Sequence, residues 1–187
     1  MQRSPITAVA AVGRQFLRSK PRRRGACEVF VNHRGIDTKR HVAGLLHHHL
    51  GGAGVRAFLD SKSMKPGDKL FDKIHVAIGE CKVGVAVFSP MYCESYFCLH
   101  ELSLMVQARK RLVPIFCDVK PSELRVKDHY GGAACTAEDL RRFRSALEQA
   151  KYTVGLTFDT LQGDWAEFLA SATDVVMKNL AEVEEEE

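Results

Sequence analysis

The stretch "VGVAVFS", Val83–Ser89, is an unbroken apolar run with the length of a buried strand. It is followed by "SYFCLHELSLMVQARK", Ser95–Lys110, whose apolar residues recur with the spacing of an amphipathic helix. A second apolar run, "LVPIFCD", covers Leu112–Asp118. Strands that are apolar throughout and joined by a helix are typical of parallel strands buried on both faces. The centre of the chain therefore predicts a parallel sheet covered by helices.

The same alternation extends outward in both directions. Further strands are predicted at Cys27–Asn32, Val55–Asp60 and Tyr152–Phe158, and further helices at Val42–His49, Phe71–Ile78, Ala137–Lys151 and Trp165–Leu180. The connections "RGIDT" (34–38) and Ser61–Lys69 are predicted to be loops. Five strands in this pattern predict a flavodoxin-like doubly wound α/β fold, a five-stranded parallel sheet with helices on both faces. Ligands of such folds bind at the carboxyl ends of the strands.

Charge divides the chain into three parts. Residues 1–26 contain seven basic side chains and no acidic one, so they are predicted to be a disordered basic arm or an organelle-targeting segment. Residues 27–180 are the predicted folded domain, and residues 181–187 are a predicted acidic tail. Residues 28–187 carry 20 basic and 23 acidic side chains, which argues against nucleic acid as a partner.

The six cysteines give no sign of a metal site or a disulfide framework. They form no C-x-x-C pair, and most lie in apolar runs, as buried free thiols do. This usage favours a reducing, cytoplasmic location. No apolar run reaches the length of a membrane span. The consecutive histidines His47–His49 point in different directions on a helix, so they cannot converge on one metal ion, and no metal site is predicted.

One residue of the Ser95–Lys110 helix breaks the pattern of that helix. Glu101 falls inside the apolar arc. Its helical neighbours are Phe97, Cys98, Leu104 and Met105. An ionised carboxylate loses its hydration on such a face and is seldom buried without a partner. Two explanations remain open: Glu101 pairs with a nearby cation such as Arg34, or it performs chemistry.

Several familiar nucleotide motifs are excluded by their context. "GGAG" (51–54) follows a helix and precedes a strand, whereas the dinucleotide fingerprint requires the opposite order. "PGDK" (66–69) lacks the adjacent Lys-Ser/Thr of a phosphate loop. The third strand ends in Phe88-Ser89, without the phosphoacceptor aspartate that a receiver domain needs.

Four phrases occur in order along the chain: "VFVNHRGIDT", "AFLDSKSMKPGDKL", "VAVFSPMYCESYFCLHEL" and "VPIFCDVKPSELR". Together they closely resemble the plant Toll/interleukin-1 receptor (TIR) domain. The resemblance runs from about Cys27 to Leu180. With no nucleotide-binding module or leucine-rich repeat after it, the chain resembles a TIR-only plant protein of the NAD-cleaving type.

The resemblance implies a site. The catalytic glutamate of these enzymes lies in a "C-L-x-E-L" phrase, which here places it at Glu101. The residues implied to bind substrate are His33, Arg34, Gly35, Asp60, Ser95 and Phe97. The family usually has phenylalanine at His33 and tryptophan at Phe97; both replacements keep a flat ring. From the residues alone, the alternatives are that Phe97 is a plain core side chain and that Gly35 is a simple turn residue.

The resemblance also implies a function. The preferred interpretation is an NAD+ glycohydrolase/cyclase that gives nicotinamide plus ADP-ribose or a cyclic ADP-ribose isomer as a plant immune or cell-death signal. NAD+ is then the substrate, and no cofactor is expected. Partners would be a second copy, bound through the Ser61–Lys69 loop, and other TIR proteins. The alternatives are a non-enzymatic adaptor for TIR–TIR contacts in defence signalling and a degenerate domain that senses NAD.

Overall fold

The computed structural model describes residues 26–38, 41–63, 66–130 and 135–187. The predicted basic arm of residues 1–26 lies outside these ranges apart from Ala26. Two residues of the predicted 61–69 loop, Met64 and Lys65, also lie outside them.

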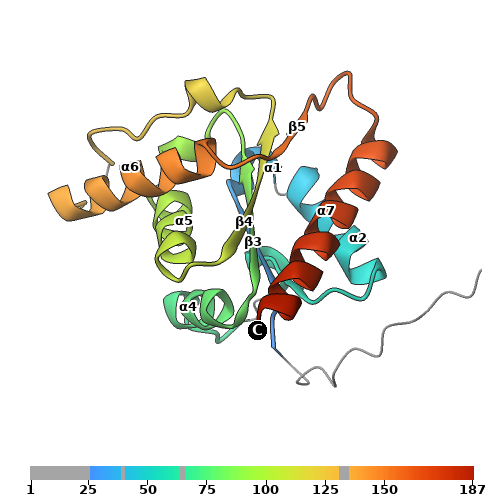
Figure 1. The fold of residues 1–187 in the computed structure, drawn as a ribbon. Coiled ribbons are helices and arrows are strands. Elements are labelled where there is room, and N and C mark those ends of the chain that lie inside the picture. The colour runs from blue at the N-terminus through green and yellow to red at the C-terminus, as the bar shows by residue number, and fades with distance from the viewer. Residues whose placement is uncertain (1–25, 39–40, 64–65, 131–134) are drawn as a thin grey trace, which may run out of the picture.

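A five-stranded sheet forms the centre of the domain (Figure 1). Its strands are β1 (Val29–His33), β2 (Ala57–Phe58), β3 (Val83–Phe88), β4 (Arg111–Cys117) and β5 (Leu156–Phe158). They lie in the order β2-β1-β3-β4-β5, and every neighbouring pair is parallel. This is the strand order of a flavodoxin-like doubly wound sheet, so the predicted fold is confirmed.

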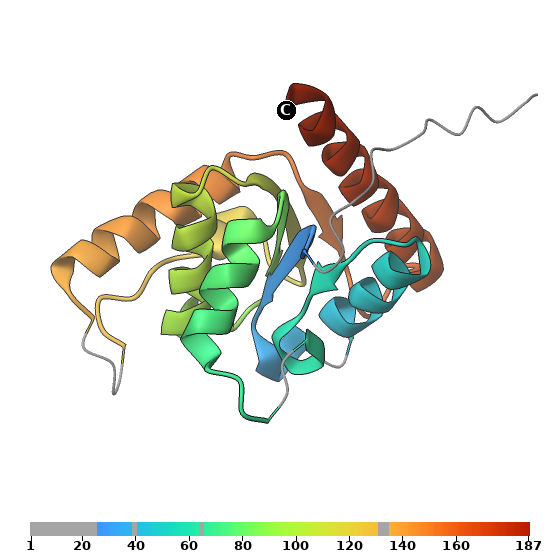
Figure 2. The ribbon, with the colours of Figure 1, turned by 90° about the horizontal axis from the view of Figure 1, so that it is seen from below.

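Helices cover both faces of the sheet (Figure 1 and Figure 2). One face is covered by α2 (Val42–Gly52) and α7 (Trp165–Glu186), and the other by α4 (Leu70–Glu80), α5 (Tyr96–Gln107) and α6 (Ala137–Lys151). Short helices α1 (Gly35–Thr38) and α3 (Asp60–Ser63) follow β1 and β2, and 3₁₀ turns lie at Tyr92–Glu94 (η1) and Pro121–Glu123 (η2).

Alternate side chains of the central strands enter two different cores, because successive residues of a strand point to opposite faces. On β1, Val29 and Val31 pack with α2 and α7, whereas Phe30 packs with α4 and α5. The same division holds on β3, where Val85 and Ala86 enter different cores. A strand buried in this way on both faces reads as the continuous apolar run seen in the sequence.

Helix α5 is held firmly at its start and along its inner face. The hydroxyl of Ser95 accepts a hydrogen bond from the backbone N–H of Cys98 at 3.2 Å, which satisfies one free donor of the first turn. Leu99, Leu102 and Met105 are fully buried against the sheet. The helix therefore presents its first two turns at a fixed position beside the carboxyl end of β1.

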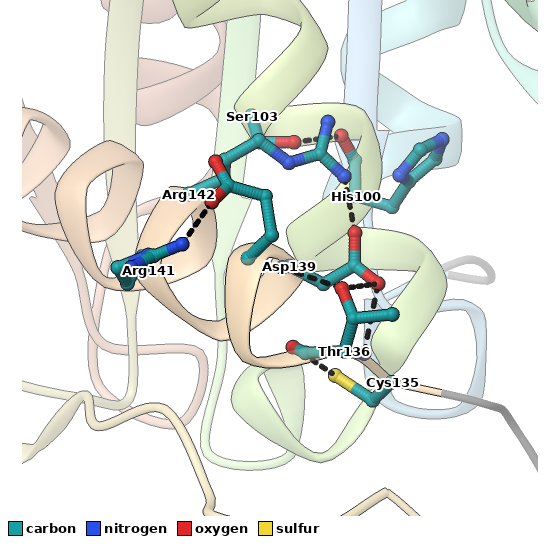
Figure 3. A network of polar contacts seen from close by, with 8 residues as sticks. His100, Ser103, Cys135, Thr136, Asp139, Arg141 and Arg142 are labelled. Carbon is teal, nitrogen blue, oxygen red and sulfur yellow. Dashed lines mark hydrogen bonds and ion pairs between the residues drawn. The ribbon is translucent and has the colours of Figure 1, made fainter.

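Helix α6 begins with a polar network beside the outer face of α5 (Figure 3). The hydroxyl of Thr136 accepts from the N–H of Asp139 at 3.1 Å, and the Asp139 carboxylate accepts from the N–H of Thr136 at 3.0 Å. Arg142 donates to the same carboxylate. Two hydrogen bonds hold the pKa of Asp139 below its ordinary value: the larger effect comes from the backbone N–H of Thr136 and the next from Arg142. On the neighbouring face of α5, the hydroxyl of Ser103 donates to the carbonyl oxygen of His100 at 2.7 Å.

Both predicted loops contain a short helix. In "RGIDT", the hydroxyl of Thr38 donates to the carbonyl oxygen of Arg34 at 2.7 Å, which closes the single turn α1. In the Ser61–Lys69 segment, Ser63 N donates to the Leu59 carbonyl oxygen at 2.7 Å, which closes α3. Each bond joins residues four apart. A single helical turn is too short to show a repeating apolar pattern in the sequence, so neither helix was predicted.

The two edge strands are shorter than predicted. The predicted strand Val55–Asp60 is reduced to Ala57–Phe58, and Tyr152–Phe158 to Leu156–Phe158. Each edge strand pairs with one neighbour only. In the second segment Tyr152 and Val154 are 86% and 95% exposed, so they have no sheet to pack against.

Helix α7 runs to Glu186, so the predicted acidic tail of residues 181–187 is largely a continuation of the helix. Carboxylates at a helix C-terminus oppose the helix dipole. Here they are offset by cations from the strand starts: Glu187 lies 2.6 Å from Lys82, and Glu186 lies 2.9 Å from Arg111. Ion pairs with residues distant in the chain therefore stabilise the C-terminal end of α7, although its run of glutamates is locally unfavourable there.

Gly84 of β3 allows α5 to lie close to the sheet. A Cβ atom at this position would lie 2.5 Å from the sulfur of Met105, which is fully buried. Gly84→Val should therefore overpack this core and lower the free energy of unfolding by about 1–3 kcal/mol. Urea unfolding with and without Met105→Ala tests the contact, since the smaller side chain makes room. If the losses in the free energy of unfolding of the two single variants add up to the loss in the double variant, Gly84 and Met105 do not compete for this space.

Candidate active site

A pocket of about 150 Å³ lies where the carboxyl end of β1 meets α3 and the first turns of α5. It is lined by Phe30, Val31, His33, Arg34, Gly35, Asp60, Ser95, Phe97, Cys98 and Glu101. All seven residues that the sequence predicts to be catalytic or substrate-binding are in this list. The structure thus brings them together at one place, and their individual roles stay predictions.

The Glu101 carboxylate accepts a hydrogen bond from a buried amide. Asn32 Nδ2 donates to Glu101 Oε2 at 2.9 Å and to the carbonyl oxygen of Cys98 at 3.2 Å. Burial raises the pKa of Glu101 to about 7; the Asn32 bond opposes this rise, and the negative charge of Asp60 adds to it. Near neutral pH the carboxyl group is therefore divided between its protonated and ionised forms.

The ion-pair explanation of Glu101 is not supported. Among the residues that the structure describes, no lysine or arginine nitrogen lies within 4 Å of the Glu101 carboxylate. Arg34, the cation proposed from the sequence, lines the same pocket, and its Nε atom is buried without a hydrogen-bond partner. The hydrogen-bond donor to the Glu101 carboxylate is thus the neutral amide of Asn32.

His33 connects three parts of the pocket wall. Its Nε2 atom lies 3.4 Å from Asp60 Oδ1 at the start of α3, and its Nδ1 atom lies 3.3 Å from the hydroxyl of Thr38 in α1. The His33 side chain is almost fully buried, whereas that of Asp60 is half exposed. The contact places Asp60 beside the pocket from a separate element.

Phe97 lies at the rim of the pocket and is not a core residue. It is 51% exposed, and its ring lies 5.8 Å from that of Phe71, which is 49% exposed. An exposed aromatic pair beside a polar pocket offers a flat surface for a planar ligand. The explanation of Phe97 as plain core packing is therefore wrong.

Sequence reasoning missed two residues of this site, Asn32 and Tyr92. Both are fully buried, and the hydroxyl of Tyr92 donates to Asn32 Oδ1. The available signal is a polar residue, Asn32, at the end of the predicted apolar strand Cys27–Asn32. Tyr92, in the "SPMYCESYF" connection, gave no periodic signal at all.

The described residues give no sign of a metal site. No three histidine, cysteine, aspartate or glutamate side chains among them could share an ion. His47 of the histidine triplet lies 3.2 Å from the carbonyl oxygen of Ala57, and the neighbouring rings of His48 and His49 meet edge to face. In the same part of the chain, no helix is long and apolar enough to cross a membrane.

Comparison with known proteins shows which family this chain belongs to. The TIR domain family matches residues 29–139, more than half of the chain. The chain belongs to the TIR domain family. Its TIR domain includes β1, α3 and α5, and therefore every residue that lines the pocket.

Plant proteins are among its relatives. The chain is 51% identical over 158 residues to a protein of Brachypodium distachyon named probable 2′ cyclic ADP-D-ribose synthase BdTIR. That alignment covers 84% of this chain and 70% of the relative. The TMV resistance protein N of Nicotiana glutinosa is 30% identical over 140 residues, which are 68% of this chain but only 12% of that protein.

A solved structure shares the same arrangement. The TIR domains in the activated Roq1 resistosome superimpose with a TM-score of 0.69 at 28% sequence identity. The match covers 81% of this chain and 99% of the other. The TIR domains of that activated resistosome therefore have the fold described above.

The raised pKa of Glu101 predicts a specific dependence of stability on pH. The folded protein binds this proton more tightly than the unfolded chain does, so stability is highest below the ordinary pKa of 4.5 and is lost as the pH rises through about 7. Glu101→Gln is neutral at every pH. Relative to wild type, it should gain stability on the order of 3 kcal/mol between about pH 4 and about pH 8.5.

Urea unfolding at the two pH values measures this gain. Glu94→Gln, at an exposed glutamate of η1 that pairs with Lys127, is a matched control that should show no such change. An equal difference between wild type and Glu101→Gln at both pH values would mean that the carboxyl group is not perturbed by burial.

Proposed function

We propose that this protein cleaves NAD+ at the bond between nicotinamide and ribose. The products are nicotinamide and either ADP-ribose or a cyclic ADP-ribose isomer, which serves as a signal in plant defence and cell death. The observation that carries the proposal is the Glu101 carboxylate, whose pKa burial raises to about 7, in a pocket at the strand ends of a chain 51% identical to a protein named as a 2′ cyclic ADP-D-ribose synthase. NAD+ is the substrate, and no cofactor is required.

The chemistry suits a single carboxylate. The nicotinamide ring of NAD+ carries a positive charge, so when the C–N bond breaks, the electron pair stays on its nitrogen and the ring leaves as a neutral molecule. No general acid is needed for that step. The ribose is left with oxocarbenium character, as in glycoside hydrolysis. Water then adds to give ADP-ribose with release of a proton, or a nucleophile of the same molecule closes a ring.

Glu101 supports this step in its ionised form. A carboxylate can hold the ribose hydroxyls and stabilise the positive charge that develops on the sugar, and it does so strongly where water is excluded. The Asn32 bond favours the ionised form against the burial that raises the pKa. Activity should therefore require a pH at which Glu101 has lost its proton.

The remaining pocket residues supply binding groups. Arg34 would pair with the phosphates, and Gly35 lets the backbone approach the ligand. The exposed ring of Phe97 would stack on a planar part of NAD+, the buried ring of His33 would form part of the wall, and Asp60 would accept hydrogen bonds from hydroxyl groups.

The cysteines bear on the location of the protein. All six cysteines are free thiols, which supports the proposal of a reducing, cytoplasmic location.

Replacement of Glu101 tests the proposal directly. Glu101→Ala should lower the rate of nicotinamide release at least about 100-fold, because the charge that stabilises the transition state is removed. The measurement is chromatography of the products after incubation of concentrated protein with NAD+. Glu94→Ala, which removes an exposed carboxylate outside the pocket, should retain the wild-type rate. A folded Glu101→Ala protein with near-normal turnover would show that Glu101 is not the catalytic group. A wild-type protein that releases no nicotinamide would favour the adaptor function.

We further propose that a second copy completes the pocket through its 61–69 loop. A pocket of about 150 Å³ is small beside the roughly 300–1,000 Å³ of ordinary ligand sites. The rim residue Phe97 and its neighbour Phe71 are also half exposed. The loop of a neighbouring protomer would enlarge the wall, exclude water and strengthen the electrostatic effect of Glu101. Related TIR proteins could supply the same loop.

Mixing two variants with lowered activity tests the shared site. Lys69→Glu reverses an exposed charge of the loop and should lower activity without unfolding the protein. A mixture of Lys69→Glu with Glu101→Ala should regain part of the turnover, because one copy supplies the carboxylate and the other the loop. Lys178→Glu, an exposed charge on α7, serves as the control. Specific activity that stays constant on dilution, in a protein shown to be monomeric, would argue for a site built by one chain.

A further inference from the structure

We propose that Asn32 is a positioning residue: held in one orientation by Tyr92, it fixes the Glu101 carboxylate through a single directed hydrogen bond. Its part in catalysis rests on the proposed function, whereas the hydrogen bonds themselves are those of the structure. Neither the TIR resemblance nor the pattern of the sequence pointed to this pair.

The Asn32 amide is hydrogen-bonded through both its nitrogen and its oxygen. Its two N–H hydrogens face two acceptors, Glu101 Oε2 at 2.9 Å and the carbonyl oxygen of Cys98 at 3.2 Å. Its Oδ1 atom accepts the hydroxyl hydrogen of Tyr92. Asn32 and Tyr92 both have no exposed surface. The hydrogen bond between Tyr92 and Asn32 is therefore shielded from bulk water.

Tyr92 supports the orientation of the amide. Burial raises the pKa of Tyr92 well above its ordinary value, so the hydroxyl keeps its hydrogen and remains a donor. That hydroxyl also lies 3.2 Å from the carbonyl oxygen of Cys98. If the amide turned over, its oxygen would face two acceptors, the ionised Glu101 carboxylate and the carbonyl oxygen of Cys98, and its nitrogen would face Tyr92. The hydrogen bond from the Tyr92 hydroxyl to Oδ1 therefore adds to the preference for the orientation in which Nδ2 donates to Glu101.

The Asn32 donor acts against the other influences on Glu101. Burial and the charge of Asp60 both favour the protonated carboxyl, and the Asn32 bond favours the ionised one. The titratable groups that face this site are His33 and Arg34 from β1 and its loop, Asp60 from α3, Tyr92 from η1 and Cys98 from α5. From α4, His75 contacts His100 instead, with 6.1 Å between ring centroids.

Titration of the Glu101 carboxyl group by ¹³C NMR tests this role without any use of turnover. The variants are Asn32→Ala, which removes the donor, and Tyr92→Phe, which removes only the hydroxyl that orients it. Tyr130→Phe is the matched control, because its buried hydroxyl donates to the carbonyl oxygen of Cys93 at 3.0 Å, away from the pocket. We expect the pKa of Glu101 to rise in the first two proteins and to stay at the wild-type value in the third.

Activity should follow the same order. Below the pKa, each unit of rise lowers the ionised fraction of Glu101 about tenfold. NAD+ cleavage at about pH 6 should therefore fall in Asn32→Ala and Tyr92→Phe much more than cleavage at about pH 9, where every variant is ionised. Tyr130→Phe should show an equal effect at both pH values.

An unchanged pKa of Glu101 in both Asn32→Ala and Tyr92→Phe would overturn the positioning role, whatever happens to turnover. A raised pKa in variants of a protein that releases no nicotinamide would support the positioning role and reject the proposed function. If Asn32→Ala does not fold, Tyr92→Phe decides the question alone, because it removes a single oxygen atom.

Discussion

The burial of one carboxylate against an apolar helix face is the constraint on which this site depends. Glu101 is carried on α5 between side chains that pack into the core, and burial raises its pKa to about 7. A carboxylate in this position costs stability in the ionised form unless it is hydrogen-bonded. Asn32 supplies that bond from β1, and Tyr92 holds Asn32 in place from η1. Three elements of the fold therefore meet around one charge.

The scaffold explains how these elements are kept together. β1 and β3 are adjacent parallel strands, so the chain leaves both at the same edge of the sheet, with α1 following β1 and η1 and α5 following β3. Gly84 lets α5 lie close to β3, and Ser95 caps the helix beside the pocket. The pocket lies where ligands of doubly wound sheets ordinarily bind. A rigid, doubly covered sheet thus carries a site built from helix starts and strand ends.

Much of this could be predicted from the sequence, and the rest depended on contacts between distant residues. Continuous apolar runs such as Val83–Ser89 predicted the buried strands, and the misplaced carboxylate of Glu101 marked the site. The bond from Asn32 to Glu101 joins residues 69 positions apart, so no local pattern could reveal it. The helical end of α7 was missed for the same reason, because its carboxylates are offset by Lys82 and Arg111, far away in the chain. The periodicity of apolar residues predicts which side chains are buried, but it does not predict which distant polar side chains pair with each other.

The pH dependence of NAD+ cleavage tests the central claim most directly. The profile of kcat/KM for nicotinamide release reports the ionisation of essential groups in the free enzyme. If ionised Glu101 is the catalytic group, kcat/KM should rise with pH, with a midpoint equal to the pKa of the Glu101 carboxyl, about 7. A value of kcat/KM that stays constant while the Glu101 carboxyl titrates would contradict this account.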